Sequence, residues 1–347
     1  MKKLLSLAMA TLMILGVLSG CGGGSSDSDG GGSSGSADKP IELNMNVTPS
    51  ETSVWMVAAE TFKEMVEEGT EGRYQVNIYP NEQLSSGDMV KGCEMLFTGV
   101  TDLDLHSVIN MTGFEEKLTV VTMPWLFTNG YDSVDEILFE GEGGQVLMDL
   151  VASKGAVPLA LGENGFRQIT NNVRPISSPE DMKGLKIRTP AINMYVELFK
   201  SLGADPTSMN FSEVFTALQQ GTIDGQENPY DTIRSGKIQE VQKYMTIWNY
   251  SYDPIVLSAS SKLWDSLSDE DKAVFQEAAE VACAKEVEES RKMDSEIVQE
   301  FKDSGMEVTE LTAEQVAAFQ EAVAPIYEQY RDVIGEDVFA AFGYTFD

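Results

Sequence analysis

An arginine near the end of a predicted strand is the first residue of this sequence that could bind a ligand. In the segment GLKIRTP (184–190), charged and apolar residues alternate, a pattern typical of a half-buried β-strand. Arg188 lies near the carboxyl end of this strand, the edge of an open α/β sheet where ligands bind. A guanidinium group presents paired donors that fit both oxygens of a carboxylate. Alternatively, Arg188 has no ligand role and pairs with a neighbouring carboxylate at the strand edge. The composition makes such a partner easy to find, because the chain has 56 acidic and 24 basic residues.

A second group of polar residues could suggest a metal site or a catalytic centre. In DLDLHS (102–107), Asp102, Asp104 and His106 fall on one face of a predicted strand. One histidine and two alternating acids do not define a coordination sphere. We therefore expect strand-edge polar groups here, with Ser107 near a cleft rim, and no metal, no cofactor and no enzyme. A secreted hydrolase or lyase that acts on an acidic sugar is the alternative.

Charge and cysteine content restrict the partners of the chain. The formal net charge is −32, which argues against nucleic acid, because nucleic-acid binding needs a basic surface. Cys93 and Cys283 fall in predicted helices without a metal-ligand spacing, so they are either buried thiols or one disulfide.

The first 38 residues predict a lipoprotein leader and a tether. Two lysines precede the uncharged apolar run Leu4 to Val17, which is too short to span a bilayer. The Leu-Ser-Gly-Cys sequence that ends at Cys21 resembles a bacterial lipobox, which implies cleavage after residue 20 and a lipid on Cys21. Residues 22–38 are almost entirely Gly, Ser and Asp, and we expect a flexible tether there. A plain signal peptide with an incidental cysteine is the alternative.

The remaining residues alternate between strand-like and helix-like patterns. Strands are predicted at 41–47, 74–79, 103–108, 156–161, 165–170 and 185–189, and helices at 54–68, 89–97, 132–138, 145–154, 194–202 and 211–220. This order predicts an α/β body with largely parallel pairing. From Asp269 a helical pattern continues for about 35 residues, with Ser268 as N-cap and Gly305 as its stop. Such a helix is about 50 Å long, enough to brace two lobes.

The central block GLKIRTPAINMYVELFKSLGADPTSMNFSEVFTALQQGTIDGQENPYDTI (184–233) resembles the substrate-binding subunits of tripartite ATP-independent periplasmic (TRAP) transporters of the dicarboxylate, sialic-acid and uronate type. The segments YPNEQLSSGDMV (79–90), PWLF (124–127) and GFRQIT (165–170) agree with it in order and spacing. The resemblance implies a periplasmic-binding-protein-like fold of two lobes, with hinge strands and a long helix that spans both. Lobe I would be 41–164 plus 253–292, and lobe II, which carries the ligand arginine, 165–252 plus 293–347.

The resemblance also implies the residues that bind the ligand. Arg188 would hold a carboxylate in a two-pronged salt bridge, Arg167 and Asn228 would assist, and Phe211 would pack against the ligand. Positions near the family's pocket with a weaker implied role are Asn46, His106 and Ser107. Tyr250, in the predicted hinge, either lines the pocket or packs the crossing strands.

The implied function is that of a solute receptor outside the cytoplasmic membrane. It would capture a small organic acid, deliver it to a permease driven by an ion gradient, and work as a lipid-anchored monomer. A ligand-binding co-receptor for a membrane sensor kinase is the alternative. Both a sugar acid such as a uronate and a short dicarboxylate remain open as ligands. The sugar acid is favoured, because Asn46, His106, Glu227 and Asn228 could together satisfy several hydroxyl groups.

Overall fold

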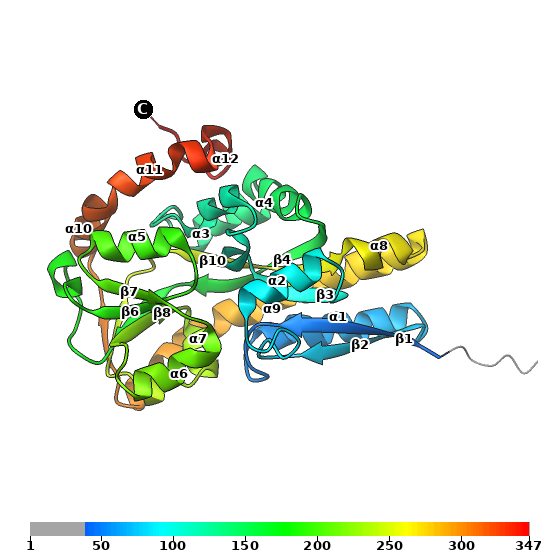
Figure 1. Ribbon diagram of the computed structural model, residues 1–347, viewed down its shortest axis with the longest axis horizontal. Helices are drawn as coiled ribbons and strands as arrows, with labels where there is room; N and C mark the ends of the chain where they lie inside the picture. Colours follow the sequence, from blue (N-terminus) through cyan, green and yellow to red (C-terminus); the bar gives the residue numbers. More distant parts are fainter. Residues whose placement is uncertain (1–38, 347) are drawn as a thin grey trace, which may run out of the picture. The chain divides into compact units, whose positions relative to one another are not determined.

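The fold is built on two mixed β-sheets, as the computed structural model of the chain shows for residues 39–346 (Figure 1). The predicted leader, Cys21 and the tether lie outside these described residues. Within them, no helix is both long and apolar enough to cross a membrane.

The first sheet has the strand order β2-β1-β3-β10-β4. Its strands are β1 (Ile41–Val47), β2 (Tyr74–Tyr79), β3 (Leu103–Ser107), β4 (Ala156–Phe166) and β10 (Tyr252–Ser260). β1 pairs in parallel with β2 and β3, whereas β10 runs antiparallel to both β3 and β4. Every residue of β10 is buried, because this strand lies inside the sheet between two neighbours.

The second sheet has the order β11-β9-β5-β8-β6-β7. Its strands are β5 (Gln168–Asn171), β6 (Lys186–Thr189), β7 (Asp205–Ser208), β8 (Gly225–Asn228), β9 (Tyr244–Ile247) and β11 (Glu307–Glu310). β6 pairs in parallel with β7 and β8, but β5 runs antiparallel to both of its neighbours. Five of the nine strand pairings within residues 39–346 are parallel and four are antiparallel, so the pairing is less parallel than expected and both sheets are mixed.

Most predicted helices are present with bounds shifted by a few residues. They include α1 (Trp55–Gly69), α2 (Met89–Phe97), α4 (Glu142–Ala152), α5 (Asn193–Ser201) and α6 (Phe211–Gln219). The predicted helix at 132–138 is a single α turn, α3 (Tyr131–Val134), followed by a π-helical turn over Asp135–Phe139. The predicted strand 165–170 is divided between the two sheets, because β4 ends at Phe166 and β5 begins at Gln168. Arg167 thus lies where the chain passes from one sheet to the other.

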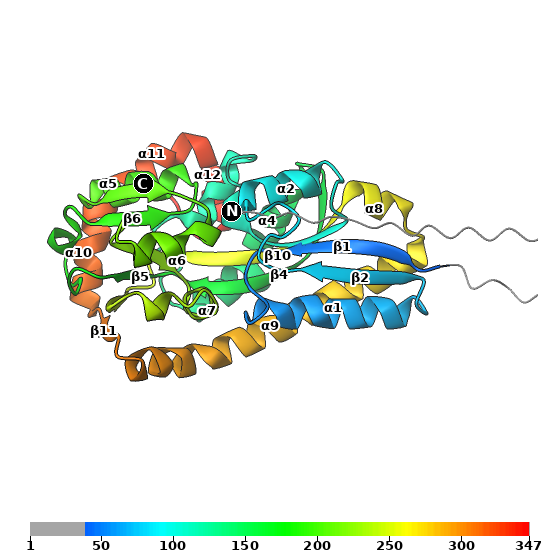
Figure 2. The ribbon, with the colours of Figure 1, turned by 60° about the horizontal axis from the view of Figure 1, so that its bottom comes forward.

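The long helix α9 (Asp269–Asp303) confirms the predicted brace. The Ser268 hydroxyl accepts a hydrogen bond from the N–H of Asp271, 3.1 Å away, as expected of an N-cap. Phe275 packs in the core of the first sheet, and Phe301 packs in the core beneath the second. Met293 contacts both cores. Figure 2 shows α9 running alongside α1 and onward to β11. One helix therefore contributes to the cores of both lobes.

The C-terminal helices pack back toward the first half of the chain. They are α10 (Ala313–Val323), α11 (Pro325–Ile334) and α12 (Glu336–Ala341). α11 contacts the 3₁₀ segment Glu116–Thr122, and α12 contacts α4. The sequence placed residues 293–347 with lobe II and residues 41–164 with lobe I. Helices α11 and α12, assigned to lobe II from the sequence, therefore pack against residues that were assigned to lobe I.

Three acidic side chains gather where β4 meets the middle of α9, with Glu163 fully buried and Asp135 and Asp294 partly exposed. Arg291 on α9 donates from Nε to Glu163 Oε2 at 3.0 Å and from its two terminal nitrogens to Asp135. The Tyr131 hydroxyl donates to Asp294 Oδ2 at 2.6 Å. Burial raises the pKa of Glu163 to about 7 and that of Asp294 to about 6, although the hydrogen bonds from Arg291 and Tyr131 act in the opposite direction.

These raised pKa values predict that the protein is more stable in mild acid than at neutral pH. Between the ordinary carboxyl pKa and the raised one, the folded state binds more protons than the unfolded state, so the free energy of unfolding falls as pH rises. For Glu163 the window is pH 4.5 to about 7, and the loss is up to about 3 kcal/mol. Thermal unfolding at pH 5 and at pH 7.5 should show the higher Tm at pH 5.

The variant Glu163→Gln should reduce the difference in Tm between the two pH values, because glutamine does not titrate. Glu60→Gln, on the exposed face of α1, is the matched control and should leave the difference unchanged. An equal pH dependence in Glu163→Gln and in the unaltered chain would contradict this assignment.

Candidate functional site

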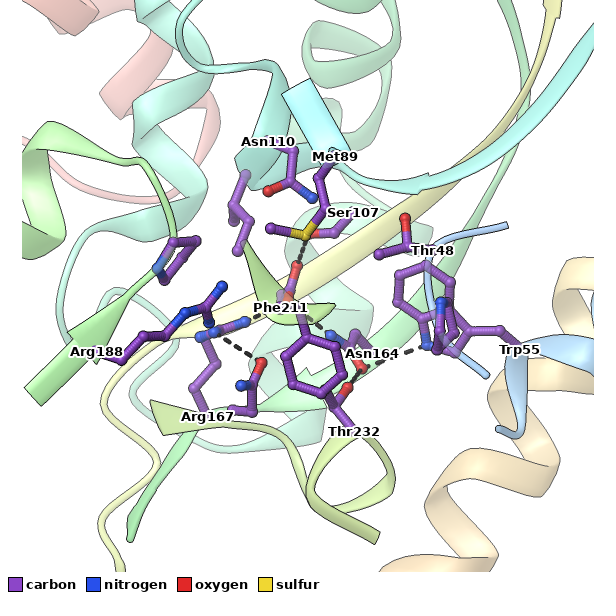
Figure 3. Close-up of a pocket in the computed structure, with 15 residues that line it drawn as sticks. Thr48, Trp55, Met89, Ser107, Asn110, Asn164, Arg167, Arg188, Phe211 and Thr232 are labelled. Atoms are coloured by element: carbon purple, nitrogen blue, oxygen red, sulfur yellow. Dashed lines mark hydrogen bonds and ion pairs between the residues drawn. The ribbon is translucent and has the colours of Figure 1, made fainter. Parts of the chain in front are cut away.

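A cavity of about 40 Å³ lies between elements of the two sheets. Its apolar wall comes from Pro49, Trp55, Met89, Ile109, Pro190 and Phe211. Its polar wall comes from Thr48, Ser107, Asn110, Asn164, Arg167, Arg188, Asn228, Thr232 and Asp253. In Figure 3, Arg188 and Arg167 lie together at one side of the cavity and Trp55 lies at the other. This volume is below the usual range of small-molecule sites, so the cavity has to widen to hold an organic acid.

Arg188 is a buried cation that has no carboxylate partner. It is 1% exposed, and its Nε and Nη2 donate to the backbone oxygen of Met209 at 3.0 and 2.8 Å. The guanidinium carbon lies 5.9 Å from the centre of the Phe211 ring. Within residues 39–346, no acidic side chain lies within ion-pair distance of Arg188. Burial lowers its pKa to about 9, so it still carries its charge at neutral pH. The alternative of a strand-edge arginine paired with a neighbouring acid is therefore wrong.

Arg167, in contrast, is paired with two carboxylates of the protein. Its Nε donates to Glu227, its Nη1 donates to Asp253 Oδ2 at 2.6 Å, and its Nη2 donates to Glu227 Oε1 at 2.9 Å. The same Nη2 also lies 3.1 Å from Asn228 Oδ1. The amide nitrogen of Asn228 donates in turn to Gln226. Arg167 and Asn228 line the cavity, and both are held there by hydrogen bonds to other protein groups.

Asp253 and Asn164 join the cavity wall into one hydrogen-bonded network. The hydroxyl of Ser107 and the amide nitrogen of Asn164 both donate to Asp253, the latter at 2.7 Å. Asn164 Oδ1 accepts from the Thr232 hydroxyl at 2.8 Å and from Trp55 Nε1 at 3.3 Å. Trp55 begins α1 beside the first sheet, whereas Thr232 follows β8 of the second, so the network crosses between the lobes.

A second contact between the lobes lies at the start of α1. The residue that precedes α1, Val54, provides no side-chain cap. Instead, Asp231 Oδ2 accepts from the Ser53 hydroxyl at 2.6 Å and from the Val54 N–H at 3.1 Å. Asp231 lies on α7 (Tyr230–Ser235), directly after β8. A carboxylate at a helix N-terminus is favourable, so Asp231 stabilises the closed arrangement of the two lobes.

Three of the sequence-predicted residues do not line the cavity. Asn46 and His106 are fully buried beside Glu82, and His106 Nε2 lies 2.8 Å from Glu82 Oε1 and 3.0 Å from Asp104 Oδ1. Although burial opposes it, the neighbouring Asp104 raises the pKa of His106 well above its usual range, with smaller contributions from Cys93 and Glu82. Tyr250 is also fully buried, and its hydroxyl donates to Glu227 at 2.7 Å. Tyr250 thus packs the crossing strands and supports Arg167 through Glu227.

The structure also decides between the two alternatives for the cysteines. Cys93 and Cys283 are both free and buried, so the disulfide alternative was wrong. Cys93 Sγ lies 3.3 Å from His106 Nδ1. No group of three or more His, Cys, Asp or Glu side chains within residues 39–346 is arranged to hold a metal ion.

Five polar residues of the cavity wall were missed in the sequence, namely Thr48, Asn110, Asn164, Thr232 and Asp253. Asn164 directly precedes the GFRQIT segment, and Asp253 directly precedes Pro254 in the predicted hinge, so proximity to these landmarks could have indicated both. Thr232 lies just beyond the QENP segment. Asn110 lies in the 3₁₀ turn Val108–Met111, which has no periodic pattern, and nothing in the sequence indicated it.

Two lobes that close on a cavity with a buried, unpaired arginine define a solute receptor of the periplasmic-binding class. The model of the bacterial extracellular solute-binding protein family 7 matches residues 45–332, and the chain belongs to this family. Its relatives and structural neighbours are solute-binding receptors, and the chain is a receptor of this kind and not an enzyme.

Individual relatives extend over most of the chain. A TRAP periplasmic solute-binding protein from Polaromonas, solved with D-erythronate, has a TM-score of 0.83 and 36% identity, covering 88% of this chain and 99% of that one. A homologue from Shewanella oneidensis with bound succinate has a TM-score of 0.82 and 31% identity, covering 87% and 98%. The 2,3-diketo-L-gulonate-binding periplasmic protein of Escherichia coli is 31% identical, covering 85% of this chain and 88% of its own length.

The contact between Asp231 and the start of α1 should affect how long a ligand stays bound. Asp231→Asn removes the charge at the helix N-terminus without changing the cavity lining. We expect dissociation of a bound acid to become about three- to tenfold faster, since a charge in this position contributes about 1 kcal/mol. Stopped-flow fluorescence, with Trp55 in the cavity wall as a reporter, measures this rate.

Asp265→Asn is the matched control, because Asp265 is exposed on α8 (Ser261–Ser266). An unchanged dissociation rate in Asp231→Asn would show that this contact does not hold the cleft closed.

Proposed function

We propose that this protein is an extracytoplasmic receptor that captures a small organic acid in its cleft and delivers it to a TRAP permease driven by an ion gradient. The observation that carries the proposal is Arg188, a buried cation in the cavity wall without a carboxylate within ion-pair distance. Burying an unpaired charge costs several kcal/mol, so such a group is retained where a ligand supplies the counter-charge. The ligands named for the relatives, D-erythronate, succinate and 2,3-diketo-L-gulonate, are all carboxylic acids.

The geometry supports a defined orientation of the bound carboxylate. The Met209 carbonyl accepts from one edge of the Arg188 guanidinium group and fixes its plane. The remaining N–H groups are then available as a paired donor for the carboxylate oxygens. Phe211 packs beside the same guanidinium group and keeps water from that side.

One arginine cannot supply the whole affinity. A charge-assisted hydrogen bond contributes about 1.5–3 kcal/mol net, whereas a micromolar to nanomolar ligand needs roughly 8–12 kcal/mol. The apolar wall of the cavity and the hydrogen bonds between the lobes, which include those of Asp231 and Asn164, provide further free energy as the cleft closes.

The proposal includes the way the receptor is held at the membrane. The leader 1–20, the lipid on Cys21 and the tether 22–38 would keep a monomeric receptor at the outer face of the cytoplasmic membrane. We also retain the division into lobe I (41–164 plus 253–292) and lobe II (165–252 plus 293–347). The chain passes from the first sheet to the second at Arg167 and returns to the first between β9 and β10. These two changes of sheet support the lobe boundaries near residues 165 and 253.

Substitution of Arg188 separates a ligand role from a structural role. Arg188→Met keeps an unbranched side chain at this position but removes the guanidinium group and its charge. We expect affinity for a bound acid to fall by about 100-fold or more, because a two-pronged charge-assisted contact is lost. The ligand-free variant should keep or gain stability, since an unpaired buried charge has been removed. Calorimetry and thermal unfolding with uronates, aldonates and dicarboxylates measure both quantities.

Arg331→Met, which removes an arginine paired with Glu328 and Glu336 outside the cavity, is the control and should bind like the unaltered chain. Unchanged affinity in Arg188→Met would overturn the proposed function at this site. A large loss of stability without ligand would instead assign Arg188 to the fold.

A further inference from the structure

The cavity wall contains three charged side chains, and only one of them lacks a partner. Arg167, Arg188 and Asp253 are the charged residues of the wall. Arg167 is paired with both Glu227 and Asp253, so these three groups together carry one excess negative charge. Arg188 has no acidic partner within residues 39–346. One ligand carboxylate therefore satisfies the only unpaired cation. A second carboxylate in this cavity would lie near the excess negative charge of the Arg167 group and would have no cation of its own.

The hydroxyl groups of the wall are arranged to accept hydrogen bonds, not to donate them. Ser107 donates its proton to Asp253, Thr48 donates to Glu82 Oε1 at 2.7 Å, and Thr232 donates to Asn164. Each of these oxygens keeps lone pairs that can accept from a ligand. A carboxylate has no proton to give them, whereas a ligand hydroxyl group does. The wall beyond Arg188 thus suits hydroxyl groups better than a second anion.

Asn110 is the amide of the wall that remains free. Asn164 and Asn228 have both their amide oxygen and their amide nitrogen engaged by protein groups. The Asn110 side chain lines the cavity, is 7% exposed and makes no hydrogen bond to another described residue. The Asn110 amide therefore faces the cavity without a protein partner, and a ligand hydroxyl group, which both donates and accepts, would satisfy it.

We propose that the cavity selects acids with a single carboxylate and a hydroxyl-bearing remainder, with Arg188 as the carboxylate anchor and Asn110 as a hydroxyl-binding residue. Asp253, together with Arg167 and Glu227, excludes a second carboxylate. This proposal rests on the proposed receptor function and narrows the class of acid. The sequence favoured a sugar acid partly because of Asn46 and His106, which do not line the cavity. The residues that do line it lead to a similar ligand class.

Matched pairs of ligands test the exclusion of a second carboxylate. D-gluconate and D-glucarate differ only at carbon 6, which is a hydroxymethyl group in the first and a carboxylate in the second. D-erythronate and meso-tartrate differ in the same way at carbon 4. Calorimetry on the full chain should show that the monocarboxylate of at least one pair binds about tenfold or more tightly than its partner. Equal or tighter binding of the dicarboxylates would overturn the proposal, and this measurement needs no variant.

Asp253→Asn tests the origin of the preference. The variant removes one negative charge and leaves Arg167 with a single acidic partner, so the ratio of the two affinities within a pair should fall by about fivefold or more. Asp265→Asn, which removes an exposed charge of the same kind, should leave the ratio unchanged. A ratio that is unchanged in Asp253→Asn as well would refute the role of Asp253.

Asn110→Ala tests the hydroxyl-binding residue. Affinity for D-erythronate should fall relative to affinity for butyrate, which has the same carbon skeleton length without hydroxyl groups. An equal loss for both ligands would mean that Asn110 acts only on the shape of the cavity, and would refute its assigned role.

If no member of either pair of ligands binds to the unaltered chain, the proposed ligand class is wrong. The receptor function would then still be decided by Arg188→Met on the wider panel of acids.

Discussion

A buried guanidinium group needs a compensating anion, and the two cavity arginines meet this requirement in opposite ways. Arg167 obtains its anions from within the chain, from Glu227 and Asp253, at the point where β4 passes into β5. Arg188 is held only by a backbone carbonyl and keeps its charge without an acidic partner. The internal pair holds the crossing strands together, and the unpaired cation defines the site. A molecule with a large excess of acidic residues can therefore still bind an anion, because a local, desolvated cation outweighs screened charges farther away.

The scaffold makes closure of the cleft and binding one process. The cavity takes its wall from loops and strand ends of both sheets, so its complete wall exists only when the lobes are together. Asp231 at the start of α1 and Asn164 between Trp55 and Thr232 hold that arrangement through hydrogen bonds that cross the cleft. α9 contributes side chains to both cores, which keeps the lobes joined whether the cleft is open or closed.

Local patterns in the sequence predicted local structure well and predicted contacts between lobes poorly. Alternation placed Arg188 on a strand, and helical spacing with a Ser268 cap located α9, because both features depend on neighbouring residues. The run GFRQIT has the pattern of one strand, yet it is divided between two sheets, because tertiary contacts of Arg167 decide where the chain turns. Alternation placed His106 on one strand face without revealing that this face packs against α2 and Glu82 and not against the cavity. Asn110 lies in a short 3₁₀ turn, where no periodic signal exists.

The strand order also determines when the chain can fold. β10, which comes from Tyr252–Ser260, lies between β3 and β4 in the middle of the first sheet, and β11 at Glu307–Glu310 completes the edge of the second. During synthesis, β1, β2 and β3 can pair early, but the first sheet is not complete until β10 has emerged to join β3 to β4. Neither sheet can therefore be complete until most of the chain has been synthesised, so a central strand of one sheet and the edge strand of the other are the last to join.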